Sequence, residues 1–133
     1  MMPRFVILHH EMPPESPRSN HWDLMLEHGS HLATWELPVA PRVGTQLKIV
    51  PLANHRVEYL DYEGPLTNHR GTVTRHDWGS YTKISDDEYQ QVVILQGQSL
   101  TIRLTIKKQS QIGQEVELRI EAESSDLQTR TEH

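Results

Sequence analysis

Short stretches in which polar and apolar side chains alternate recur along most of this chain, and turns rich in Gly and Pro separate them. Because successive side chains of a β-strand point to opposite faces, this alternation is typical of strands with one buried face. With eight prolines and seven glycines, the pattern predicts an all-β fold, either an antiparallel sandwich or a closed barrel. Closure is favoured because it removes exposed strand edges. We expect strands at residues 4–8, 21–27, 31–37, 45–50, 56–64, 71–77, 80–84, 99–108 and 114–122.

Turn residues and two irregular segments complete the expected organisation. Gly29-Ser30, Trp78-Gly79 and Gly113 mark hairpin turns between neighbouring strands. In residues 85–95, Ser85 is followed three residues later by Glu88, which is the signature of a capping box, so we expect a short helix to begin there. Residues 124–133 have few apolar side chains, and we expect them to form a flexible tail after a single domain of residues 1–123.

Composition excludes several classes of protein. A chain of 133 residues is long enough for one domain, and its net charge of −5 argues against a broadly basic surface that coats nucleic acid. The absence of cysteine excludes disulfide scaffolds, zinc–thiolate sites and cysteine nucleophiles. No apolar run approaches the roughly 20 residues of a membrane span, and no signal peptide is evident, so we expect a cytoplasmic protein that does not enter a membrane.

The segment "HWDLMLE" carries the first candidate site. On a strand, His21, Asp23 and Met25 share one face, while Trp22 and Leu24 share the other, which we expect to face the core. An imidazole nitrogen and a carboxylate oxygen form a good partial shell for Mn, Zn or another divalent ion.

A third ligand has to come from another segment. The pair His9-His10 ends the first expected strand, where the two side chains point in opposite directions, so one of the two can face the site.

The segment "NHRVEYLDYEG" supplies further polar candidates. If it forms a regular strand, His55 and Tyr59 lie on one face, and both groups can contact a phosphate oxygen or transfer a proton. The competing interpretation is structural, because a single His or Tyr on a strand is more often a surface or wall residue.

The order of several motifs resembles a known family. "FVILHH", "HWDLMLE", "ATWELP", "NHRVEYLDYEG", "RGTVTRHDWGSY" and "LQGQSLTIRL" follow one another as in the 3′-phosphoesterase domain of bacterial DNA ligase D and its stand-alone relatives. The resemblance covers residues 4–122, nearly the whole chain. It implies a compact antiparallel β-barrel with at most one or two short helices, and an active site in a groove or cavity on that barrel.

The resemblance also implies an activity and a set of residues. The family removes 3′-terminal ribonucleotides and 3′-phosphates from DNA ends with a divalent metal, commonly manganese, and zinc or cobalt are the alternatives here. His10, His21 and Asp23 then become the metal ligands, and His55 and Tyr59 lie beside the scissile phosphate as catalytic residues. His55 would also bind the phosphate. The implied mechanism is metal-assisted hydrolysis of a phosphoester.

Three positions depart from the family pattern. Basic phosphate contacts are expected at the positions of Met25, Val39 and Leu47. Arg presents a bidentate fork to phosphate that Met cannot replace. The loop between His10 and His21 is longer than usual, and its Arg18 is our candidate for a substitute phosphate ligand. Other arginines that can reach the site are Arg42, Arg56 and Arg70.

Three functions therefore compete. The first is a metal-dependent phosphoesterase acting on DNA or RNA-tailed DNA 3′ ends in DNA end repair, a monomer that works with a separately encoded ligase or polymerase. The second is a non-catalytic or substrate-shifted metal-binding barrel that recognises DNA ends or repair partners, which the missing basic residues and acidic net charge favour. The third is a structural barrel whose histidines bind nothing.

Overall fold

The computed structural model describes residues 2–109, 111 and 113–123, and the regular structure within them is β-strand apart from one short 3-10 helix. The elements are β1 (Arg4–Glu11), β2 (His21–His28), β3 (His31–Leu37), β4 (Thr45–Arg56), the 3-10 helix η1 (Val57–Leu60), β5 (Gly64–Pro65), β6 (Thr72–Asp86), β7 (Gln90–Gly97), β8 (Thr101–Lys107) and β9 (Val116–Ala122). Within the described ranges, no helix is long and apolar enough to cross a membrane.

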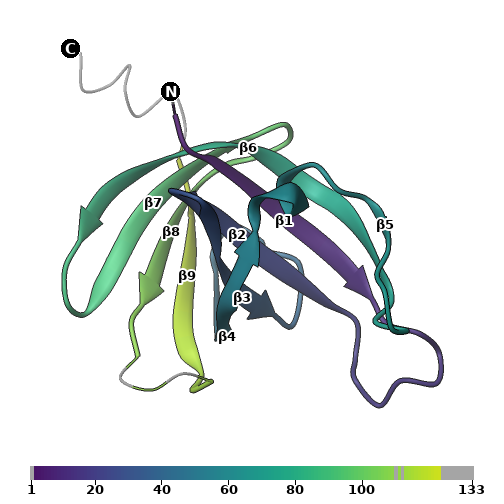
Figure 1. Ribbon diagram of the computed structural model, residues 1–133. Coiled ribbons are helices and arrows are strands. Elements are labelled where there is room, and N and C mark those ends of the chain that lie inside the picture. The colour runs from purple at the N-terminus through teal and green to yellow at the C-terminus, as the bar shows by residue number, and fades with distance from the viewer. Residues whose placement is uncertain (1, 110, 112, 124–133) are drawn as a thin grey trace, which may run out of the picture.

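The strands form one antiparallel sheet that closes on itself. Its order is β1-β2-β3-β4-β9-β8-β7-β6, and pairing between β1 and β6 completes the ring, with the short β5 attached to β6 (Figure 1). The prediction of an all-β antiparallel barrel is thus confirmed. Closure leaves no free edge on these eight strands and holds β1 between two partners from Phe5 to His10.

The main hydrophobic core fills the inside of the ring. All eight ring strands contribute to it, as alternation predicts for side chains on the inner face. Its buried members are Phe5, Ile7, Leu24, Leu26, Trp35, Leu37, Ile49, Tyr81, Val93, Leu95, Ile102, Leu104, Ile106, Val116, Leu118 and Ile120.

A second, smaller hydrophobic cluster lies on the outer face of the sheet. Leu60 of η1 packs there against Leu8 of β1, Met25 of β2 and Val73 of β6. Consequently β1 is buried on both faces, which explains why its sequence is a continuous apolar run rather than an alternating one. This outer cluster lies on the same face of β1 and β2 as the candidate site.

Residues 56–64 do not form the expected strand. Val57–Leu60 is a 3-10 helix, and only Gly64-Pro65 pairs as β5. Residues three apart share a face of a 3-10 helix, so Val57 and Leu60 both reach the outer cluster. The sequence "VEYL" satisfies this spacing as well as strand alternation, and packing against β1 decides between them.

The predicted helix in residues 85–95 is wrong. Asp87 accepts hydrogen bonds from the backbone N–H groups of Tyr89 and Gln90, which closes a hairpin turn and not a helix cap. The β-branched residues that follow continue as β7, which lies between β6 and β8 in the sheet.

The predicted turn at Trp78-Gly79 is also wrong, because β6 runs through it without a break. A Cβ atom on Gly79 would lie 2.0 Å from the carbonyl oxygen of Gln96, so this glycine permits the close approach of β6 and β7. By contrast, the hairpins at Gly29-Ser30 and around Gly113 are confirmed, and both glycines have positive φ, at 62° and 84°. The predicted tail, 124–133, lies outside the described residues.

Candidate metal centre

Pairing between β1 and β2 brings three of the predicted residues together on the outer face. His10 lies opposite His21, and Asp23 follows two residues later on the same face of β2. One ligand atom from each of the three side chains lies within 4.8 Å of the other two. His10 is the histidine of the N-terminal pair that joins this group. The ring of His9 points the other way and stacks on Trp22, with a centroid separation of 4.5 Å.

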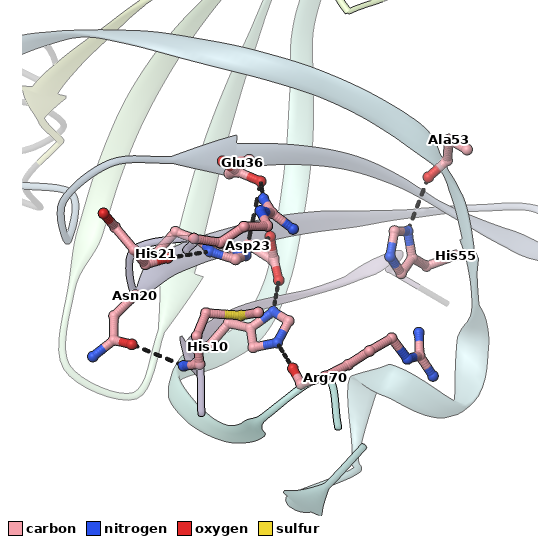
Figure 2. Close-up of polar contacts among 11 residues, drawn as sticks. His10, Asn20, His21, Asp23, Glu36, Ala53, His55 and Arg70 are labelled. Carbon is pink, nitrogen blue, oxygen red and sulfur yellow. Dashed lines mark hydrogen bonds and ion pairs between the residues drawn. The ribbon is translucent and has the colours of Figure 1, made fainter. Parts of the chain in front are cut away.

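Hydrogen bonds from outside the group orient both imidazoles. His10 Nε2 donates to the carbonyl oxygen of Arg70 at 2.6 Å, and His21 Nδ1 donates to that of Ser19 at 3.1 Å (Figure 2). Each ring therefore turns its other nitrogen towards Asp23. His10 Nδ1 lies 3.3 Å from Oδ2, and His21 Nε2 lies 3.6 Å from Oδ1. Such outer partners fix the tautomer and orientation of metal-binding histidines.

The carboxylate of Asp23 lacks a full set of partners. His21 and Asp23 are only 4% and 5% exposed, and Oδ1 of Asp23 has no hydrogen-bond partner among the described residues. A buried carboxylate oxygen without a partner is costly, and a cation removes this cost. The hydrogen bond to Asp23 raises the pKa of His10 above its usual value.

The donor set fits a divalent metal. Two imidazoles and one carboxylate form a three-residue set that leaves coordination positions open for water or substrate, as catalytic metal sites require. The three side chains come from two adjacent strands of a closed barrel, so their positions are set by the sheet itself.

Glu36 belongs to the same surface, although the sequence did not single it out. It lies opposite Asp23 in the β2–β3 pairing, and its Oε1 is 3.8 Å from His21 Nε2 and 2.5 Å from Nη2 of Arg18. The sequence does contain a signal for this position, because a two-residue turn at Gly29-Ser30 fixes the register of the hairpin and pairs residue 23 with residue 36. The candidate phosphate ligand Arg18 is thus beside the group, bound to Glu36.

His55 and Tyr59 do not share the face of one strand. His55 is near the end of β4 and Tyr59 is in η1, yet their rings meet edge to face with centroids 5.8 Å apart. The ring of His55 donates from Nδ1 to the carbonyl oxygen of Ala53, which leaves Nε2 free to act, and it lies apart from the three candidate metal ligands in Figure 2.

An open cavity of about 460 Å³ lies beside Tyr59. Arg56, Tyr62 and Arg70 also line it. Arg70 connects the two regions, since its carbonyl oxygen holds His10 while its side chain lines this cavity.

The three non-basic positions have different surroundings. Met25 is 2% exposed and packs in the outer cluster. Leu47 packs against the inner core, and Val39 is 48% exposed beyond the end of β3. Leu47 therefore faces away from the metal group on the outer face, and Met25 is covered by apolar side chains.

The family model described as "DNA Ligase D 3'-phosphoesterase domain" matches residues 10–127, which is most of the chain. The chain belongs to the DNA ligase D 3′-phosphoesterase domain family. No curated protein matches it significantly. Membership supports a 3′-phosphoesterase function in general, and the matched range includes every residue assigned above to the site.

Proposed function

We propose that this member of the DNA ligase D 3′-phosphoesterase family is a metal-dependent hydrolase that removes a 3′-terminal ribonucleotide or 3′-phosphate from DNA ends during end repair. The observation that carries the metal dependence is the convergence of His10, His21 and Asp23, with an oxygen of Asp23 buried and unpaired among the described residues. Manganese is the ion we propose, with zinc or cobalt as alternatives.

The proposed roles of the residues follow from their chemistry. His10, His21 and Asp23 hold the ion, which when bound neutralises phosphate charge and lowers the pKa of water. His55 binds the phosphate and, with Tyr59, donates hydrogen bonds or a proton to its oxygens. Support comes from the edge-to-face contact of the two rings beside an open cavity.

Arg18 is the proposed phosphate-binding cation. Its guanidinium already lies beside the metal group through Glu36, and its side chain is largely exposed, so its remaining N–H donors can reach an anion. In this role Arg18 would replace the basic phosphate contact that the family pattern expects at position 25, where this chain has Met. We further propose a monomer that acts with a separately encoded ligase or polymerase.

The decisive experiment uses a labelled DNA primer that ends in a ribonucleotide or a 3′-phosphate. We expect the purified chain to shorten or dephosphorylate it with manganese and not with chelator. His21→Ala and Asp23→Ala should abolish metal binding and turnover. Tyr59→Phe should keep the metal bound and slow turnover by roughly 10²-fold or more, the usual contribution of a positioned proton donor. Metal binding by His21→Ala at the wild-type level would refute the assignment.

The alternative is a binding function without catalysis. The net charge of −5 and the apolar side chains at Met25, Val39 and Leu47 favour it, because each missing cation weakens the hold on phosphate. In that case the manganese-loaded protein binds end-labelled DNA, the binding weakens as salt is raised, and no product forms. Turnover of either primer would exclude this alternative.

A further inference from the structure

Glu36 directs a carboxylate oxygen at the ring nitrogen of His21 that faces the metal group. His21 Nδ1 is engaged by the carbonyl oxygen of Ser19, so Nε2 is the nitrogen available to an ion, and Glu36 Oε1 lies 3.8 Å from it. This separation is too long for a hydrogen bond between the two side chains. A divalent cation placed between the imidazole nitrogen and the carboxylate oxygen would attract both.

The separation of Glu36 from His21 suits two ligands of one ion. Two atoms that are each about 2.1 Å from a metal are about 3.0 Å apart at a right angle, 3.4 Å apart at a tetrahedral angle and 4.2 Å apart when opposite. The separations to Asp23 are 3.3 and 3.6 Å, and that from His21 to Glu36 is 3.8 Å. Glu36 extends the group onto a third strand, β3, directly across from Asp23 (Figure 2).

We propose that Glu36 is a fourth protein ligand of the metal centre and that a divalent ion takes its Oε1 from Arg18. The two carboxylates then balance the charge of the ion, and the released guanidinium is free for a substrate phosphate. Binding of the metal would in this way prepare the anion site. The inference rests on the metal site of the proposed function and adds a residue that the family resemblance did not supply.

Arg18 can make this exchange because it is tied to the barrel by little else. Its side chain is 55% exposed, it belongs to the loop between β1 and β2, and among the described residues its guanidinium binds Glu36. By contrast, Glu36 is only 25% exposed and is fixed on a strand. Arg18 therefore competes with the ion for one oxygen, and removal of Arg18 should strengthen metal binding.

The test measures Mn²⁺ affinity of the full chain by titration calorimetry and by loss of the free-Mn²⁺ EPR signal, without phosphate present. Glu36→Gln should bind Mn²⁺ at least about 10-fold more weakly. Arg18→Gln should bind it several-fold more tightly, since a nearby positive charge is lost. The matched control is Glu88→Gln, which removes an exposed carboxylate from the β6–β7 turn and should leave the affinity unchanged.

Inorganic phosphate, titrated into the Mn²⁺-loaded proteins, gives the second readout. Arg18→Gln should bind it at least about 10-fold more weakly than wild type, whereas Glu88→Gln should match wild type. Unchanged Mn²⁺ affinity in Glu36→Gln would overturn the proposal, and so would weaker Mn²⁺ binding in Arg18→Gln.

His21→Ala separates this inference from the proposed function. If His21→Ala loses Mn²⁺ and Glu36→Gln keeps it, the three-residue centre stands and only the role of Glu36 fails. If His21→Ala keeps Mn²⁺ at wild-type affinity, the metal site itself has been misplaced.

Discussion

Met25 lies two residues beyond Asp23 on the same face of β2, yet its surroundings are apolar. It is 2% exposed and packs in the outer cluster with Leu8, Leu60 and Val73. The family pattern expects an arginine there, which invites the substitution Met25→Arg as a gain of function. The packing leads us to expect the opposite result.

We expect Met25→Arg to lower the free energy of unfolding by about 3–5 kcal/mol, the cost of an unpaired buried charge. Met25→Leu keeps the volume and should cost less than about 1.5 kcal/mol. Urea denaturation of the two variants measures the difference. Wild-type stability of Met25→Arg together with faster 3′-end processing would show that the new side chain leaves the cluster and reaches the anion.

The loop between β5 and β6 is the element that orients His10. Gly71 has a φ of 92°, and a Cβ atom there would lie 2.0 Å from the backbone oxygen of Glu11. The next residue back, Arg70, supplies the carbonyl oxygen that binds His10 Nε2. Close docking of this loop on the end of β1 therefore sets the direction of a metal ligand.

We expect Gly71→Ala to lift the loop from β1 and weaken Mn²⁺ binding by about 10-fold or more, the usual loss when an outer partner of a ligand is removed. Gly113→Ala is the matched control. Gly113 has a similar φ of 84° but no atom within 4 Å of the added Cβ, so it should cost about 1–2 kcal/mol of stability and no metal affinity. Equal metal affinity of both variants would separate the loop from the site.

Asp86 lies at the β6–β7 hairpin, where it forms ion pairs with Lys83 and Lys108. Hydrogen bonds from Lys108 and Lys83 lower the pKa of Asp86 from 3.8 to about 2. A carboxylate with a lowered pKa in the folded state stabilises the fold above its unfolded pKa, and this contribution is lost as the pH falls towards 2. Asp86→Asn should therefore flatten the loss of stability between pH 4 and pH 2. Because these charges are exposed, added salt should shrink the difference.

Local sequence patterns predict part of the fold and part of the metal group. The turn at Gly29-Ser30 fixes the β2–β3 register, and alternation puts His21 and Asp23 on one face. Two of the three candidate ligands can therefore be predicted from one segment. The strand prediction for residues 57–60 is wrong because their spacing suits a 3-10 helix and a strand equally. Burial of Leu60 against a strand distant in sequence selects the helix. The partner of His10 lies 60 residues away in a loop, where no local pattern points to it.

Closure of the barrel sets the positions of the candidate metal ligands before any ion binds. β1 is paired on both sides, by β2 and β6, and it is buried on both faces by the inner core and the outer cluster. The backbones that carry His10, His21 and Asp23 are thereby fixed without help from a ligand. The fold should consequently survive removal of metal, unlike small domains that fold only around zinc.

We therefore expect chelator to leave the far-ultraviolet circular dichroism spectrum unchanged while it lowers the melting temperature. Mn²⁺ at 100 times its dissociation constant should stabilise the native state by about 2.7 kcal/mol, because an ion that binds only the folded chain adds its binding free energy to stability. For a domain of this size that corresponds to a rise of about 10 °C. His21→Ala should melt at the same temperature with and without Mn²⁺. A Mn²⁺-dependent rise in that variant would mean that the stabilising ion binds elsewhere on the barrel, whereas unfolding by chelator alone would mean that the closed sheet is not sufficient to hold the site.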